Sequence, residues 1–172
     1  MYNVGDLIVY GGEGVCRVDS IGPLDSPHAD RSRDYYTLLP LYRDGRVITP
    51  VDTSVSIRPV ISRAEAETMI ASIPSVEAEI FETRNLRELE EHYRSQIKTQ
   101  TCTDLIRLIR SIRLKRIKLR KLGKKLGVID ERYMRRAEDM LHGEFAVALD
   151  IPKDSVADYI SGRVSDADLL LT

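Results

Sequence analysis

The sequence predicts an α+β chain of two domains, a small β-rich domain at residues 1–60 and a compact all-helical domain at residues 61–172. Short apolar runs separated by turn signals fill the first part, which is typical of strands. Beyond Arg58-Pro59 the apolar residues instead recur three or four positions apart, which is typical of helices. A length of 172 residues accommodates one domain or two small ones.

The β-rich domain is expected to contain four or five short strands. An Asp-Gly turn at residues 43–45 predicts a hairpin, and residues 22–33, which include proline, aspartate and serine, predict a loop. So many short strands in about sixty residues fit a small, strongly bent barrel of the SH3 or Tudor kind. The expected strands are Leu7–Tyr10, Val15–Ile21, Tyr35–Tyr42, Arg46–Val51 and Val55–Ile57.

The helical domain opens with a helix-start signal. Ser62 and Glu65 have the spacing of a capping box, and Pro74 should end this first helix. Asp130 is a suitable N-cap for a long helix that reaches about Leu149. Helical spacing also predicts the apolar faces of three helices. One consists of Leu86, Leu89, Tyr93 and Ile97, and the long helix contributes Tyr133, Ala137, Met140, Leu141 and Ala148. The third, on a short last helix, consists of Val156 and Ile160.

Between these helices lies a strongly basic stretch, Leu105–Leu126, which contains ten basic residues and no acidic one. On a helix its apolar residues gather on one side and most of its bases on the other. Some apolar residues, among them Ile106, also point to the basic side, so another helix should cover part of it. The bases are Arg107, Arg110, Arg113, Lys115, Arg116, Lys118, Arg120, Lys121, Lys124 and Lys125; the apolar side holds Leu105, Leu108, Ile109, Ile112, Leu119 and Leu126.

The net charge of −1 hides an uneven distribution of charge along the chain. Ten of the 26 basic residues lie in the stretch, which leaves 16 against 27 acidic residues elsewhere. The sequence therefore predicts a bipolar molecule whose basic face binds a polyanion, most simply the backbone of nucleic acid. The alternative is a solvated helix face without a ligand.

Signals for catalysis, cofactors or metals are weak throughout the chain. Residues 11–14 are glycine-rich but lack the lysine and hydroxyl residue of a phosphate loop, and the three histidines have no partner at metal-ligand spacing. We therefore expect no enzyme, no cofactor, no metal and no small-molecule substrate. Cys16 and Cys102 are expected to be buried free thiols. Without a leader or a membrane-spanning run, the protein is expected in the cytoplasm and away from membranes.

Several short motifs resemble one known family, over nearly the whole chain up to about residue 150. The opening Val4-Gly5-Asp6-Leu7-Ile8-Val9-Tyr10, followed by Gly14-Val15, resembles that of the CarD/CdnL family of bacterial RNA-polymerase-binding transcription regulators. Their first domain is similar to the RNA-polymerase-interacting domain of transcription-repair coupling factor. Further similar segments are Tyr35-Tyr36, Ile48-Thr49-Pro50-Val51, Tyr93-Arg94 and Gly143-Glu144-Phe145-Ala146.

This resemblance implies a task for each domain. The Tudor-like domain would add a strand to the RNA polymerase β subunit, and the helical domain would touch promoter DNA beside the melted region and stabilise the open complex. By position, the docking strand is Arg46, Val47, Ile48 and Thr49; its alternation should turn one pair toward the core, unless the strand is internal. The expected DNA contacts are Arg94, where the family has a basic contact, and Arg132, next to a second such position that Glu131 occupies in this chain. The basic stretch adds Arg110, Arg113, Lys118, Lys121 and Lys124 as expected phosphate contacts.

One departure concerns Leu89. Members often carry at this position a tryptophan that wedges into the minor groove, and this chain contains no tryptophan. Leucine can also act as an apolar wedge, but Leu89 equally fits the buried face with Leu86 and Tyr93. A competing function is an interaction module that binds polymerase, or another acidic partner, without direct DNA contact.

Overall fold

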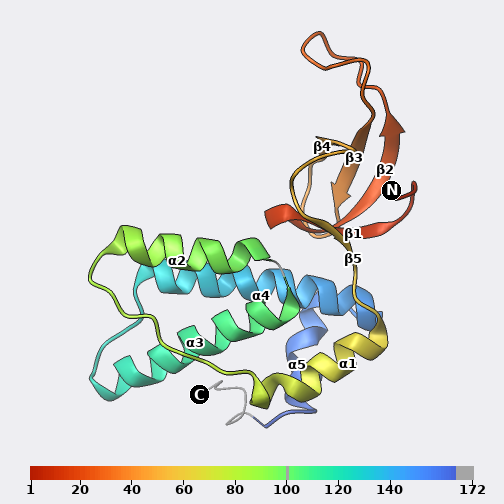
Figure 1. The fold of residues 1–172 in the computed structure, drawn as a ribbon. Coiled ribbons are helices and arrows are strands. Elements are labelled where there is room, and N and C mark those ends of the chain that lie inside the picture. Colours follow the sequence, from red (N-terminus) through yellow and green to blue (C-terminus); the bar gives the residue numbers. More distant parts are fainter. Residues whose placement is uncertain (100, 166–172) are drawn as a thin grey trace. The chain divides into compact units, whose positions relative to one another are not determined.

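The computed structural model describes residues 1–99 and 101–165 of the chain. It divides into two compact units, Met1–Val60 and one that begins at Ile61. A five-stranded antiparallel sheet forms the first unit and five α-helices form the second, which confirms the predicted α+β class (Figure 1). The part of the helical domain predicted beyond residue 165 lies outside the described residues.

The first unit contains five short strands. They are β1 (Leu7–Tyr10), β2 (Gly14–Gly22), β3 (Tyr35–Pro40), β4 (Val47–Pro50) and β5 (Ile57–Pro59). In the sheet their order is β4-β3-β2-β1-β5, so that β4 and β5 form the two edges. A 3-10 turn, Gly11–Glu13, joins β1 to β2.

The sheet is strongly bent, as the sequence predicts. The hydroxyls of Tyr10 in β1 and Thr49 in β4 lie 3.1 Å apart, although β2 and β3 separate these strands in the sheet. A register shift between Val18 and Ser20 adds to the twist of β2. No ladder joins β4 to β5 within residues 1–60, so the sheet curls without closing. Its core contains Ile8, Tyr10, Cys16, Val18, Tyr36 and Leu38.

The second unit packs around one long helix. Helix α4 (Val128–Leu149) contacts each of the other four helices. Short 3-10 segments, Ile73–Ser75 and Lys153–Ser155, follow the first helix and precede the last. The other helices are α1 (Arg63–Ser72), α2 (Leu86–Thr99), α3 (Cys102–Lys121) and α5 (Val156–Ser161).

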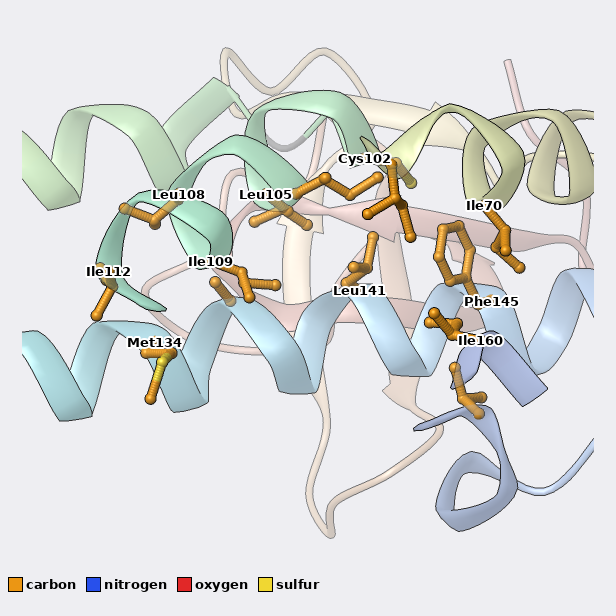
Figure 2. Packing of buried hydrophobic residues seen from close by; sticks show 14 of the residues in the cluster. Ile70, Cys102, Leu105, Leu108, Ile109, Ile112, Met134, Leu141, Phe145 and Ile160 are labelled. Carbon is orange, nitrogen blue, oxygen red and sulfur yellow. The ribbon is translucent and has the colours of Figure 1, made fainter. Parts of the chain in front are cut away.

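The apolar side of α3 forms the centre of this core. Figure 2 shows Leu105 and Ile109 of α3 facing Leu141 and Phe145 of α4. Ile106 is also buried, as expected for a basic side that is partly covered. Burying an aliphatic side chain of this size contributes about 1.5–3 kcal/mol, so this seam holds the two helices together. The buried residues of α3 are Cys102, Leu105, Ile106, Leu108, Ile109 and Ile112.

Local capping signals have mixed outcomes. The capping box is confirmed, because Glu65 N–H donates to Ser62 Oγ at 3.1 Å and Ser62 N–H donates to Glu65 Oε2 at 2.7 Å. The prediction for Asp130 is wrong: α4 starts three residues earlier, with Gly127 at the N-cap, and Asp130 is buried. Leu86 is the first residue of α2 and is 64% exposed, so it does not join the predicted buried face.

Candidate interaction surfaces

Strand β4 offers one open edge of the sheet. It pairs with β3 along one side, and no strand lies on its other side within residues 1–60. Val47 and the buried Thr49 turn toward the core, whereas Arg46 and Ile48 are exposed. The opposite edge, β5, has three residues and ends at Pro59, which has no N–H to donate. The edge at β4 is therefore the better template for another strand.

Two arginines expected to contact DNA come together in the second unit. Arg94 of α2 and Arg132 of α4 both bind Glu90, at 3.6 Å and 2.5 Å. The guanidinium of Arg132 also lies over the Tyr133 ring, 5.3 Å from its centroid. Both arginine side chains remain more than half exposed, at 65% and 56%. Glu90 thus gathers two cations on one surface and partly neutralises them.

Behind this cluster lies a buried polar centre. Asp130 accepts hydrogen bonds from the Tyr93 hydroxyl at 2.6 Å and from Lys115 Nζ at 2.9 Å. Burial, together with the adjacent carboxylate, raises the pKa of Tyr93. These bonds link α2, α3 and α4. Lys115, whose side chain is 14% exposed, therefore serves the core instead of the surface.

Other bases of the basic stretch also have carboxylate partners in the chain. Arg113, with a side chain 14% exposed, binds Glu138 at 2.7 Å, and Lys118 binds Glu82 at 2.5 Å. The hydrogen bond from Lys118 lowers the pKa of Glu82. Arg107 pairs with Asp104 at 2.5 Å in the first turn of α3, and Arg110 is half-buried. Much of α3 is therefore less positive than its sequence suggests.

Unpaired positive charge concentrates where α3 ends. We call residues 120–128, which join α3 to α4, the basic turn. Its four bases are exposed, and within the described residues no carboxylate lies within ion-pair distance of them. Lys121 and Lys124 were expected contacts; their neighbours Arg120 and Lys125 were not singled out. The run of bases around Gly123 was the available signal, since glycine is common just past the end of a helix.

The side chain of Leu89 is buried, whereas a side chain that wedges into DNA must be exposed. It is 4% exposed and lies in the core with Tyr93 and Ile97. Leu89 therefore has a packing role in this structure.

The described residues show neither a membrane-crossing helix nor a metal-binding cluster. None of their helices is long and apolar enough to span a bilayer. No group of three or more histidine, cysteine, aspartate or glutamate side chains there could hold a metal ion.

Comparison with known proteins gives one result for the β-rich unit. Residues 2–61 match the family model of the CarD-like/TRCF RID domain. No curated protein matches the chain. The matched range contains the five strands and includes the open edge at β4. Residues 2–61 of this chain therefore form a CarD-like/TRCF RID domain.

Proposed function

We propose that this protein is a transcription regulator that docks on the RNA polymerase β subunit through β4 and contacts promoter DNA through its helical unit. By holding both, it modulates the stability of the open complex. The observation that carries the proposal is the CarD-like/TRCF RID domain, with its open strand edge, joined to a unit that has unpaired surface cations. The role is binding, and it needs no reacting group.

The docking step uses main-chain hydrogen bonds. An added strand pairs with the open edge of β4, and outward side chains select the partner. Ile48, 40% exposed, supplies an apolar contact in the middle of the strand, and Arg46 precedes it. Val47 and Thr49 support the strand from the core side.

The DNA step uses phosphate contacts, which position a protein without reading sequence. Lys121 and Lys124 of the basic turn and the pair Arg94 and Arg132 are the exposed contributors. Arg110, Arg113 and Lys118 would contribute by exchanging their present partners for phosphate. With about four to six phosphates neutralised, log K should fall against log salt with a slope of about −4 to −5.

A second candidate function is favoured by the ion pairs along α3. Because Arg107, Arg113 and Lys118 already bind carboxylates, the helical unit can act as an interaction module without DNA. Polymerase binding that is unaffected by promoter DNA would support this reading.

The docking test is co-purification with polymerase. Ile48→Glu should abolish it, because a buried interface cannot accept the new carboxylate. Val55→Glu is the matched control, since Val55 is an equally exposed aliphatic residue (41%) outside the strands. Equal loss in both variants, or no loss in either, would argue against docking through β4.

The DNA test is fluorescence anisotropy on a promoter fragment at several salt concentrations. Lys121→Glu with Lys124→Glu should reduce the slope by about two, at about 0.9 per lost phosphate contact. The control, Arg17→Glu with Lys98→Glu, changes net charge equally at exposed residues that do not belong to the basic turn. An identical slope in all three proteins would place the DNA contact elsewhere.

A further inference from the structure

A small cavity lies inside the helical unit, between α3, α4, α5 and the 3-10 segment that follows α1. Its volume is about 80 Å³, and it is partly open to solvent. Aliphatic side chains form most of its wall, and all but one of them are buried in the core. They are Ile73, Ile106, Ile109, Leu141 and Ile160, with the exposed Ala157. Figure 2 shows Ile109, Leu141 and Ile160 in this core.

Two arginines give the lining a positive charge. Arg110 and Arg113 lie one helical turn beyond the isoleucines that α3 contributes to the wall, on the same face of that helix. Within the part of the chain that the structure describes, no carboxylate belongs to the lining. Glu138, outside the lining, binds Arg113 at 2.7 Å and holds its guanidinium in place. An anionic group is therefore the electrostatic complement of the lining.

Two further side chains add hydrogen-bonding groups to the lining. They are His142 of α4 and Ser161 of α5. Burial lowers the pKa of His142, so its imidazole is neutral near neutral pH and offers one N–H donor. The hydroxyl of Ser161 can donate as well. Guanidinium groups with such neighbouring donors match the oxygen atoms of a carboxylate.

We propose that the cavity binds a short-chain carboxylate, with the aliphatic chain against the isoleucines and the carboxylate at Arg110. Cavities with aliphatic walls stay dry and accept apolar groups. At about 30 Å³ for each water-sized group, the volume accommodates a chain of roughly three carbon atoms. With the carboxyl group at the mouth, the ligand therefore has about four or five carbons.

This inference goes beyond the proposed function and does not depend on it. The molecule is bound as a ligand and is not converted. Because α5 supplies part of the wall, the bound carboxylate contacts this short helix together with α3 and α4. A ligand that binds only the folded state also stabilises that state, so the helical unit should unfold at a higher temperature when it is loaded.

The experiment titrates the isotope-labelled full chain with isovalerate and follows the amide chemical shifts. Isovalerate should produce saturable shifts at the lining residues of α3, α4 and α5. Two probes separate the parts of the ligand, because acetate lacks the aliphatic chain and isovaleramide lacks the charge. Each should bind on the order of tenfold more weakly, since one loses buried apolar groups and the other its charge-assisted hydrogen bonds.

Two variants connect the binding to this cavity. Arg110→Gln should weaken isovalerate binding about tenfold, whereas Arg107→Gln, on the same helix but outside the lining, should leave it unchanged. Since a substitution at Arg110 can also perturb the core, the second variant fills the cavity instead. Ala157→Leu enlarges an exposed side chain of the lining and should abolish binding; Ala64→Leu, exposed on α1, is its control.

Three results would overturn the proposal. The first is the absence of saturable shifts at millimolar isovalerate. The second is equal binding of isovaleramide, which would make the site purely apolar, or of acetate, which would place the anion on the surface. The third is unchanged isovalerate affinity in Ala157→Leu, which would exclude this cavity. None of these results bears on polymerase docking or DNA binding, which the co-purification and anisotropy experiments test separately.

Discussion

The hydroxyl of Tyr93 in α2 donates a 2.6 Å hydrogen bond to the buried carboxylate of Asp130 in α4. Lys115 of α3 binds the same carboxylate, so one acidic group joins three helices that carry the proposed DNA contacts. Arg132 and the basic turn both lie close to Asp130 in the sequence. Their positions on the surface therefore depend on where α4 begins. We therefore expect this buried centre to determine the geometry of the surface.

Removing the Tyr93 hydroxyl should destabilise the helical unit. Tyr93→Phe should lower the free energy of unfolding by about 1.5–3 kcal/mol, the contribution of a hydrogen bond to a charged group. Tyr133→Phe is the control, because the Tyr133 hydroxyl reaches Glu90 only at 3.4 Å. Urea denaturation of both variants measures the difference. Equal stabilities would mean that Lys115 alone satisfies Asp130.

The helical unit should lose stability in mild acid. Burial lowers the pKa of His92 and of His142, so the unfolded chain binds protons first as the pH falls below about 6.5. The free energy of unfolding should therefore decrease between about pH 7 and 5. His92→Gln with His142→Gln should flatten this part of the profile, whereas replacing the exposed His28 should leave it intact. Thermal unfolding at several pH values measures these profiles. Parallel profiles for all three proteins would contradict the prediction.

Glu90 should restrain DNA binding. Its carboxylate holds both Arg94 and Arg132, so phosphate must displace it. Glu90→Gln should tighten binding about two- to fivefold, as expected from releasing exposed ion pairs. Glu91→Gln removes the same charge from the next residue of α2, where no ion pair with either arginine is present. Anisotropy titrations that show weaker binding for Glu90→Gln would argue that the carboxylate organises the arginines productively.

Truncating Leu89 should affect folding before function. Leu89→Ala leaves a cavity in the core and should lower the free energy of unfolding by about 2–5 kcal/mol. The folded fraction should bind promoter DNA as tightly as the wild-type protein. A stable Leu89→Ala protein that binds promoter DNA more weakly would instead favour the wedge role for Leu89.

Local patterns in the sequence predicted the elements well, because capping and spacing act over a few residues. Ser62 and Glu65 start α1 as expected, and the alternation of Val47 and Thr49 with Arg46 and Ile48 matches the two faces of β4. The curvature of the sheet was also predictable, from the number of short strands.

Side-chain partners that are distant in sequence were not predictable. Asp130 satisfies the local rule for an N-cap, but burial against Tyr93 and Lys115 outweighed it, and Gly127 took that position. Likewise Arg113 and Glu138 meet only when α3 packs on α4. The basic face therefore appeared continuous in the sequence, whereas in the structure its unpaired charge lies mainly in the basic turn.

The most direct test is the lifetime of the open complex on one promoter. Wild-type protein should change this lifetime, and Ile48→Glu or Lys121→Glu with Lys124→Glu should each abolish the change, because one loses the polymerase and the other the DNA. Val55→Glu should behave as wild type. A lifetime unaffected by the wild-type protein, or changed equally by all the variants, would contradict a regulator that bridges polymerase and promoter.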